Sequence, residues 1–438
     1  MILQRPIDGA DSNALYSDWG AVGQELLRLS DAGFADGIGE MVGDRPEPRA
    51  ISNALSQQSE ETPSEIGASD FLWAWGQFID HDLDLTEAGT VEFAPIQVPL
   101  GDPWFDPDSQ GGALIPFLRV HHETGSGEDS PRAYVNEITA FLDASMVYGS
   151  DNDTAAALRD DGGRLLIGAN GLLLQTNTTG VLAGDVRAAE NVALTSLHTL
   201  FVREHNRLVA QLEVDHPDWS SDDLYHAARM RVEAEIQAIT YNDFLPILVG
   251  EEAIAHYQGY DSSVNPGISV EFSTAAYRFG HSLLSATLER VNEDGTTIDD
   301  GDLALRDAFF NPAVLAASGI DPVLRGLGSG DAQKLDTLVV EDVRSFLFGD
   351  PASGGLDLAS INIQRGRDLG VASYNDLREA LGLARAEDFS DITSARLCTI
   401  SGSGPGPEDT LIGDELEGVV EGHDDAAHVV NVLPFAVV

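Results

Sequence analysis

The sequence predicts a mainly α-helical protein with long loops and little sheet. Apolar residues recur at helical spacing over long stretches, and strict alternation of apolar and polar residues is scarce. Residues 191–213 show the clearest helical pattern because neither Pro nor Gly interrupts it, and residues 222–241 predict a second long helix. Shorter helical signals cover residues 24–29, 70–86, 273–290, 303–315, 339–347 and 374–383.

Composition narrows the classes of partner. The 438 residues include 73 acidic and 24 basic side chains, and the formal net charge is −49. Such a charge repels nucleic acid and anionic membrane surfaces, so neither is expected as a partner. No apolar run reaches the roughly 18 residues of a membrane span. Cys398 is the only cysteine, so no disulfide can form within this sequence.

The chain divides into three parts by composition. Residues 1–69 are rich in Gly, Pro, Asp and Ser, which predicts an extended arm packed on the body. Residues 70–391 are expected to form that body, and five prolines between residues 95 and 116 exclude long helices there. Residues 392–438 predict a Gly-, Pro- and acid-rich tail. The tail is either a short disordered segment or, through EDTLIGDELEG, the remnant of a calcium-binding Gly–Asp (RTX-like) repeat.

One stretch, residues 70–86 (DFLWAWGQFIDHDLDLT), combines polar and aromatic side chains in a helix-compatible run. Gln77, Asp80 and His81 share one helical face, because residues three and four apart are neighbours on a helix. This face is either the wall of a buried reaction site or the solvated side of a surface helix. The neighbouring aromatic residues favour the reaction site.

A second stretch, residues 136–150, places oxygen-bearing groups at alternate positions. Thr139, Phe141 (through its backbone carbonyl), Asp143 and Ser145 would face one way in an extended segment. Hydroxyl, carbonyl and carboxylate oxygens suit a hard cation such as Ca²⁺. The start of a capped helix explains the same pattern, so both interpretations stay open on these residues alone.

Three further stretches carry Arg beside His, Asn or an acid: GDVRAAEN (184–191), AYRFGHS (276–282) and SINIQRGRD (360–368). Together with WGQFIDHDLDLT they resemble the animal-type haem peroxidases of the peroxidase–cyclooxygenase superfamily. The order is that of the family: a distal His run, a calcium loop, a distal Arg, a proximal His and a supporting Asn. The resemblance covers about residues 5–390 and predicts a bacterial member of the family, with its haem-peroxidase helical bundle.

The resemblance implies a distal site. His81 would be the acid–base residue, Arg187 its cationic partner, and Gln77 would help to hold water or halide. Asp80 and Glu190 match the carboxylates that form ester links to haem in mammalian members. Where one member forms a third link through Met, this sequence has Asn.

The resemblance also implies a proximal site for haem b. His281 would bind the iron, and Asn362 would hydrogen-bond the other ring nitrogen of this histidine. Arg278 would pair with a haem propionate, and Arg365 is a second candidate for that role. A Ca²⁺ site would be formed by Asp82 together with the residues of the alternating stretch, namely Thr139, Phe141, Asp143 and Ser145.

These expectations favour a peroxidase that reduces hydrogen peroxide and oxidises halides, thiocyanate or small organic donors. Without the Met link, iodide, thiocyanate and bromide are expected to be oxidised better than chloride. One alternative is a non-catalytic haem- or calcium-binding remnant, because family members continue with further helices after the position of Asp391. Another is a fatty-acid dioxygenase, but the Tyr that those members carry three residues before the proximal His is replaced by Arg278.

Location and histidine usage complete the expectations. Residues 1–10 lack the basic and then apolar layout of a secretory signal, which predicts a cytoplasmic protein. If the tail is a secretion repeat, a C-terminal signal would place the protein outside the cell. His198 and His205 lie in the first long helix and are expected to pack or cap. The sequence does not determine the oligomeric state.

Overall fold

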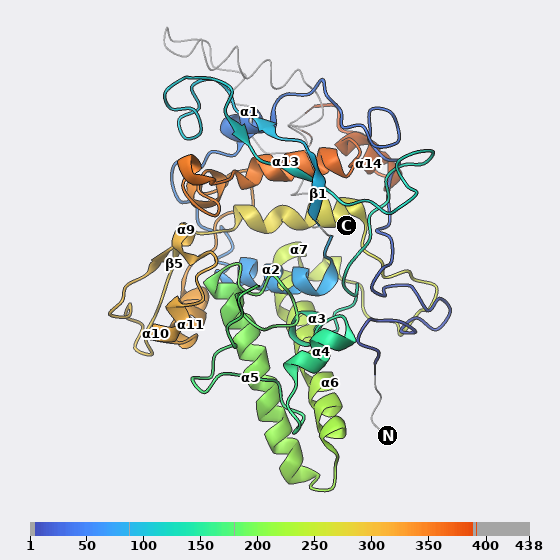
Figure 1. Ribbon diagram of the computed structural model, residues 1–438, viewed down its shortest axis with the longest axis vertical. Helices are drawn as coiled ribbons and strands as arrows, with labels where there is room; N and C mark the ends of the chain where they lie inside the picture. Colours follow the sequence, from blue (N-terminus) through green and yellow to red (C-terminus); the bar gives the residue numbers. More distant parts are fainter. Residues whose placement is uncertain (1–4, 87, 179, 389–390, 392–438) are drawn as a thin grey trace.

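The computed structural model describes residues 5–86, 88–178, 180–388 and 391. Helices dominate the described chain (Figure 1), which confirms the predicted fold class. The tail at residues 392–438 lies outside the described residues. The α-helices are α1 (Pro48–Leu55), α2 (Phe71–Leu83), α3 (Ser145–Tyr148), α4 (Asn152–Leu158), α5 (Val192–Asp215), α6 (Ser221–Ile239), α7 (Leu245–Val249), α8 (Val270–Thr274), α9 (Leu305–Ala308), α10 (Val314–Ser318), α11 (Asp321–Ser329), α12 (Glu341–Arg344), α13 (Leu358–Asp368) and α14 (Tyr374–Ala380).

Short helical turns and strands connect these helices. The turns are the π-helical η1 (Thr240–Phe244) and the 3₁₀ turns η2 (Glu251–Ala253), η3 (Ala276–Ser282) and η4 (Pro351–Ser353). The strands are β1 (Ala88–Phe93), β2 (Ile96–Gln97), β3 (Leu114–Ile115), β4 (Leu118–Val120), β5 (Thr287–Leu288) and β6 (Leu303–Ala304). Among the described residues they form antiparallel pairs β1–β4, β2–β3 and β5–β6, so no extended sheet organises the fold.

The long helices α5 and α6 lie side by side at one end of the molecule (Figure 1). The apolar stripe of α5 is buried along its length, because Leu194, Leu197, Leu208 and Leu212 face the core. A capping box at Ser220 starts α6. Both long helices were predicted, and the structure confirms them.

Helix α2 carries the predicted polar stripe and packs its aromatic face on α5. The Phe78 ring stacks on Phe201 with ring centroids 5.2 Å apart, and the Trp75 ring lies 5.8 Å from the same phenylalanine. Burial of these rings against α5 fixes which face of α2 is left for the polar residues. The helix predicted within residues 70–86 is therefore confirmed, and its polar face is turned toward the protein interior.

Four of the shorter helix predictions differ from the structure. Residues 24–29 are not helical: the Leu26 and Leu27 backbone N–H groups donate to the carbonyls of Tyr134 and Ile268 at 2.7 and 2.9 Å, so distant partners hold the segment extended. Residues 273–290 break at Ala275 (φ −122°) into α8, η3 and β5. A 3₁₀ turn has nearly the same apolar spacing as an α-helix, so periodicity did not separate them.

The helix expected over residues 303–315 is also interrupted, and that over 339–347 is shortened to α12. Leu303 and Ala304 pair with β5 as β6, and Phe310 adopts a left-handed backbone conformation with φ 49°. Pro312 follows two residues later and cannot donate to a continuing helix. No described helix combines the length and apolar character that crossing a membrane requires.

A buried ion-pair network joins α1 to two distant segments of the chain. Arg49 on α1 donates through Nε to Asp102 and through Nη1 to Asp357, at 2.7 and 2.8 Å, and all three side chains are fully buried. Burial by itself would lower the pKa of Arg49, but hydrogen bonds and charges from both carboxylates raise it. Arg49 therefore neutralises two acids in the interior.

Replacing Arg49 with Met should destabilise the fold by about 3–5 kcal/mol, because two buried carboxylates lose their partner. Urea unfolding followed by circular dichroism measures this loss. Arg385→Met is the matched control, since Arg385 pairs with Asp376 while half exposed, and this change should cost about 0–1 kcal/mol. Equal losses in both variants would contradict the importance assigned to the buried network.

Candidate active site

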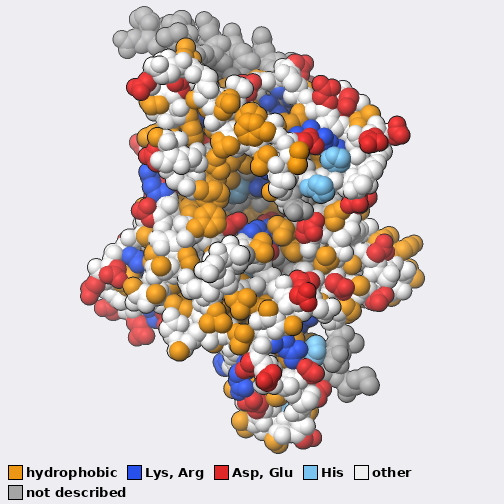
Figure 2. Space-filling view, in the orientation of Figure 1, with side chains coloured by type: hydrophobic (Ala, Val, Ile, Leu, Met, Phe, Trp, Pro, Cys, Tyr) orange, Lys and Arg blue, Asp and Glu red, His pale blue; other side chains and the backbone are white. Residues whose placement is uncertain are grey.

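The candidate site lies between α2 and the segments η3 and α13, which follow one another as layers in Figure 1. Figure 2 shows the surface hollowed near the middle of this face, with basic, acidic and histidine side chains at the margin of the hollow. Helix α2 contributes the distal wall, by which we mean the side that carries His81. Segments η3 and α13 contribute the proximal wall, the side that carries His281.

His81 is almost fully buried, at 3% exposure, and its two ring nitrogens face different surroundings. Nδ1 lies 3.6 Å from Oδ1 of the buried Asp185 and has no hydrogen-bond partner among the described residues. Nε2 lies 4.0 Å from Oε2 of Glu190, whose side chain is 29% exposed, so Nε2 faces the accessible side. Burial, assisted by the charge of Arg187, lowers the pKa of His81 well below its usual value. The imidazole is therefore neutral near pH 7.

Arg187 follows the buried Asp185 by two residues, and that carboxylate orients its guanidinium. Arg187 donates to Asp185 through Nε and Nη2, both at 2.9 Å, and Nη1 lies 3.7 Å from Oδ2 of Asp80. Burial alone would lower the pKa of Arg187, but the charge and hydrogen bonds of Asp185 together with the charges of Asp80 and Asp84 outweigh it, and the pKa rises. The guanidinium stays charged at all relevant pH values and is held in one plane.

A hydrogen-bonded chain fixes the side-chain amide of Gln77. Its Nε2 donates to Oε2 of Glu190 at 3.1 Å, and its Oε1 accepts from Nδ2 of Asn191 at 2.7 Å. Asn191 also caps the start of α5, because its Oδ1 accepts from the Leu194 backbone N–H. The polar stripe of α2 thus meets the segment that contains the predicted Glu190.

Asp80 and Glu190 are surrounded by protein, yet about 30% of each side chain remains accessible. That combination is expected of groups that line an interior hollow. Burial, reinforced by the charge of Asp84, raises the pKa of Asp80 to about 8. Burial also raises the pKa of Glu190 above its usual value. Both carboxyl groups are therefore more readily protonated than surface acids.

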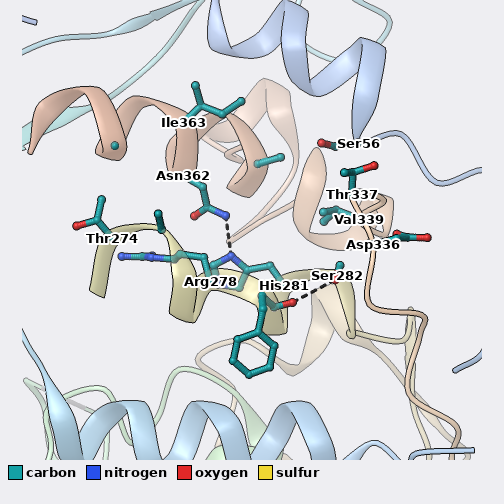
Figure 3. Close-up of a pocket in the computed structure, with 14 residues that line it drawn as sticks. Ser56, Thr274, Arg278, His281, Ser282, Asp336, Thr337, Val339, Asn362 and Ile363 are labelled. Atoms are coloured by element: carbon teal, nitrogen blue, oxygen red, sulfur yellow. Dashed lines mark hydrogen bonds between the residues drawn. The ribbon is translucent and has the colours of Figure 1, made fainter. Parts of the chain in front are cut away.

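On the proximal wall, His281 and Asn362 meet although 81 residues separate them (Figure 3). Nδ2 of Asn362 lies 2.7 Å from Nδ1 of His281, whereas Oδ1 of the same amide is buried without a partner among the described residues. Burial, with a smaller contribution from Arg278, lowers the pKa of His281 to about 3. The ring is neutral and can bind a metal through Nε2.

Two arginines stand on the proximal side. Nε of Arg278 donates to the carbonyl of Ser273 at 3.4 Å, and Arg278 forms no ion pair with any described residue. Its positive charge stabilises the ionised forms of Asp80 and Glu190, which places it beside the same hollow. Arg365 instead donates to Asp368 at 2.6 Å and lies over the ring of Phe117.

The predicted cation ligands come together beside α3, and most are fully buried. Oδ1 of Asp82 accepts from the Ser145 hydroxyl at 2.6 Å, and Oδ1 of Asp143 accepts from the Thr139 hydroxyl at 3.0 Å. Oδ2 of Asp143 is buried without a partner among the described residues, and the backbone carbonyl of Phe141 accepts from the Asp143 N–H. Burial, together with the charge of Asp143, raises the pKa of Asp82 well above its usual value.

This arrangement concentrates oxygen atoms around two buried carboxylates that have no ion-pair partner in the described chain. No group of three or more His, Cys, Asp or Glu arranged to hold a metal ion occurs within the described residues, so hydroxyl and carbonyl oxygens would have to complete any cation site. The alternative of a helix start is also realised, because α3 begins at Ser145. Ala144, the residue before this helix, adopts φ 61°, which turns the chain at this point.

Sequence reasoning missed Asp185, Asp84 and Ser273. Asp185 lies two residues before Arg187, and this short spacing is the sequence feature that could have indicated that its carboxylate orients the arginine. The hydroxyl of Ser273 donates to Oδ2 of the buried Asp84, a contact between residues 189 positions apart that no local pattern encodes. His205 has the expected packing role, since its nitrogens contact the Tyr148 hydroxyl and the Gly163 carbonyl.

Comparison with known proteins gives a consistent result. The animal haem peroxidase family model matches residues 4–399. The chain is 36% identical to thyroid peroxidase of Sus scrofa, over 89% of this chain and 50% of that protein. It is 34% identical to peroxinectin A of Dictyostelium discoideum, over 79% of this chain and 69% of that protein. The chain therefore spans about half the length of the thyroid peroxidase it matches.

Solved structures share the fold. Peroxidase A from Dictyostelium discoideum superposes with a TM-score of 0.84 at 29% identity, covering 98% of this chain and 86% of that one. A fatty acid α-dioxygenase from Arabidopsis thaliana superposes with a TM-score of 0.77 at 19% identity, covering 97% of this chain and 70% of that one, which shows a common fold alone. From the family match and these identities, the chain belongs to the animal haem peroxidase family, and this membership implies haem as its prosthetic group.

Proposed function

We propose that this chain is a haem-dependent peroxidase that reduces hydrogen peroxide and oxidises small donors. The observation that carries the proposal is the neutral His81 beside the charged Arg187, across the site from His281. In the overall reaction, one hydrogen peroxide takes up two protons and two electrons from the donor and becomes two waters. Haem, when bound, supplies the redox chemistry, and the side chains supply orientation and proton transfer.

The residues of the site fit haem. His281 would hold the iron through Nε2, because Nδ1 is engaged with Asn362. Rotation of the Asn362 amide would let its unpartnered Oδ1 accept from an Nδ1–H, which fixes the tautomer that metal binding requires. Arg278 lacks an anionic partner among the described residues and suits a propionate. Arg365 is a weaker candidate because Asp368 already pairs with it.

On the distal wall, the side chains would move one proton and stabilise one charge. His81 would accept a proton from peroxide at Nε2 and return it to the departing oxygen, a type of step that contributes about 10²–10⁴-fold. Arg187 would stabilise the negative charge on that oxygen without moving, because Asp185 already orients it. Gln77 would present its fixed amide to water or halide.

Asp80 and Glu190 are proposed to form ester links to haem methyl groups. Each would replace a methyl C–H and a carboxyl O–H by a C–O bond, and one hydrogen peroxide would take up the two hydrogens and two electrons as two waters. Their accessible, readily protonated carboxyl groups support this role. Haem that leaves the peroxide-treated chain completely in acidic solvent would contradict the proposal.

Halides, thiocyanate and small organic molecules are the proposed donors. Asn191 stands where one family member has the Met that forms the third haem link, and its side-chain amide donates a hydrogen bond to Gln77. Iodide, thiocyanate and bromide should therefore react faster than chloride, as comparison of the four oxidation rates would test. A dioxygenase activity is less well supported, because the hydroxyl of Tyr277 donates to the Gly76 carbonyl at 3.1 Å and is not free to react.

An absorption spectrum of the purified, haem-supplemented chain tests the proposed activity. We expect a Soret band that shifts when hydrogen peroxide is added and recovers when a donor such as iodide follows. A chain that takes up no haem supports the alternative of a non-catalytic remnant. A bound haem that does not respond to peroxide also contradicts the peroxidase proposal.

A Ca²⁺ site is proposed at Asp82, Thr139, Phe141, Asp143 and Ser145. Two buried carboxylates without ion-pair partners among the described residues, one with an unpartnered oxygen, support a divalent cation there. Asp82 directly follows His81, so a bound cation would hold the backbone of the distal histidine. The proposed Ca²⁺ thereby couples metal binding to the geometry of the distal wall.

Removing Ca²⁺ with EGTA should lower both the thermal midpoint and the rate of the peroxide reaction, because two buried carboxylates lose their counter-ion. Differential scanning calorimetry and the Soret shift measure the two effects. Asp143→Asn should reproduce them, whereas Asp153→Asn should not, because Asp153 is exposed on α4. Identical midpoints and spectra with and without EGTA would argue against the site.

We propose that the arm (residues 1–69) and the body (residues 70–391) form one catalytic unit, and that residues 392–438 are an appended tail. Glu25 and Leu27 pair with Val135 and Ser269, and α1 packs on α13, which carries Asn362. Deleting residues 1–69 should therefore prevent folding, as circular dichroism would show. An extracellular, calcium-rich location is proposed from the acidic composition, and recovery of the protein only from lysed cells would contradict it.

A further inference from the structure

The C-terminal end of α2 is joined to the proximal wall by a short series of hydrogen bonds. Nη2 of Arg187 donates to the backbone carbonyl of Asp84 at 3.1 Å. The hydroxyl of Ser273 donates to Oδ2 of Asp84, and Nε of Arg278 donates to the Ser273 carbonyl at 3.4 Å. The series therefore links the distal arginine to the proximal arginine through Asp84 and Ser273, which we call the wall-joining pair.

The wall-joining pair is shielded from solvent. Asp84 and Ser273 are each only 7% exposed. Oδ1 of Asp84 is buried without a partner among the described residues, so Ser273 is the one described side chain that donates to this carboxylate. Removing the hydroxyl would leave a buried carboxylate without a side-chain donor, which forces the end of α2 to adjust.

A second hydrogen bond joins the same two walls. The hydroxyl of Tyr277 donates to the carbonyl of Gly76 at 3.1 Å. Gly76 and Asp84 are eight residues apart, about 12 Å along a helix, and His81 lies between them. One connection would leave the tilt of α2 free, whereas two connections fix both its distance and its tilt relative to the proximal wall.

We propose that Asp84 and Ser273 are positioning residues that set the orientation of Arg187 across the site. Asp185 binds one edge of the guanidinium, and the second bond of Nη2, to the Asp84 carbonyl, prevents rotation about that edge. The pair does not touch the reacting atoms and acts through Arg187. This inference rests on the proposed function, because it assigns the purpose of the fixed arginine.

Ser273→Ala, Ser273→Thr and Ser282→Ala in the haem-loaded full chain test the proposal. Ser282 is the matched control, because its buried hydroxyl donates to the Phe279 carbonyl within η3. The rate of cyanide binding, followed by the Soret band, reports on proton transfer and anion stabilisation at the distal wall. We expect a fall of roughly 10- to 100-fold in Ser273→Ala at unchanged haem content. Ser273→Thr should restore the rate, and Ser282→Ala should retain it.

Equal cyanide rates in Ser273→Ala and Ser282→Ala would overturn the proposal. So would a loss of haem in Ser273→Ala that threonine does not rescue, since this outcome indicates a purely structural role. A wild-type chain that binds cyanide but ignores peroxide would refute the proposed function while leaving this ordering of rates intact.

Hydrogen exchange in the haem-free chain gives an independent measurement. Exchange over residues 185–191, which include Arg187, should rise in Ser273→Ala and stay unchanged in Ser282→Ala. If both variants exchange alike, the pair does not position the arginine.

Discussion

His281→Ala should abolish stable haem binding, and this is the largest effect that we expect. Nδ1 of His281 is engaged with Asn362, so Nε2 is the nitrogen proposed to bind iron, and no other histidine that the structure describes shares this contact with α13. Alanine removes the ligand and leaves the Asn362 amide without its ring partner. The measurement is the ratio of Soret to protein absorbance after haem supplementation and gel filtration.

His216→Ala is the control for haem retention. His216 stacks on Trp219 at the end of α5, with ring centroids 3.8 Å apart, far along the chain from the proximal segment. Asn362→Ala should give an intermediate result, with haem bound but dissociating faster, because the ligand remains while its orientation is lost. Full haem content in gel-filtered His281→Ala would refute the ligand assignment.

His81→Ala should leave haem bound and slow the reaction with peroxide by about 10²–10⁴-fold. The imidazole is neutral, lies in the field of the Arg187 charge and can accept a proton through its accessible Nε2. Stopped-flow absorbance of the Soret band measures the rate. Retention of the wild-type rate would assign the proton transfer to another group.

The pH dependence of the peroxide reaction provides a matched test of His81. Burial and the charge of Arg187 lower the pKa of His81 below the ordinary value of about 6.5 for histidine. The neutral, proton-accepting form therefore persists as pH falls through 6.5, and the rate should decline only at lower pH. Asp185→Asn removes a charge that raises this pKa, so it should move the acid limb to still lower pH. An acid limb near 6.5 in the wild-type chain would contradict the buried environment.

Local patterns predicted the elements that depend on local contacts. The stripe of Leu194, Leu197 and Leu208 predicts α5 because helical packing buries residues three and four apart. The polar face of α2 is likewise a consequence of spacing alone, and the structure confirms the helix. The helix prediction for residues 24–29 is wrong because hydrogen bonds to Tyr134 and Ile268 outweigh the weak helical preference of this segment.

Local sequence patterns likewise predicted some features of the site, whereas other features depend on tertiary packing. The order of the motifs indicated the family, and spacings of three and four residues from Gln77 predicted that Asp80 and His81 lie on its face of α2. Residues that act together across the site come from distant positions, and their contacts arise only when the helices pack. Asp185 illustrates the limit, since its sequence position next to Arg187 is visible but its burial beside His81 is not.

By itself the sequence determined the helical class, the motif order and the chemical types available at each wall. The tertiary structure decided which nitrogen of His81 faces the hollow, that Asn362 meets His281, and that Ser273 joins Asp84. The physical reason is the range of the interactions. Helical spacing is set by residues within about four positions of each other, whereas the hydrogen bonds of the site join residues 81 and 189 positions apart.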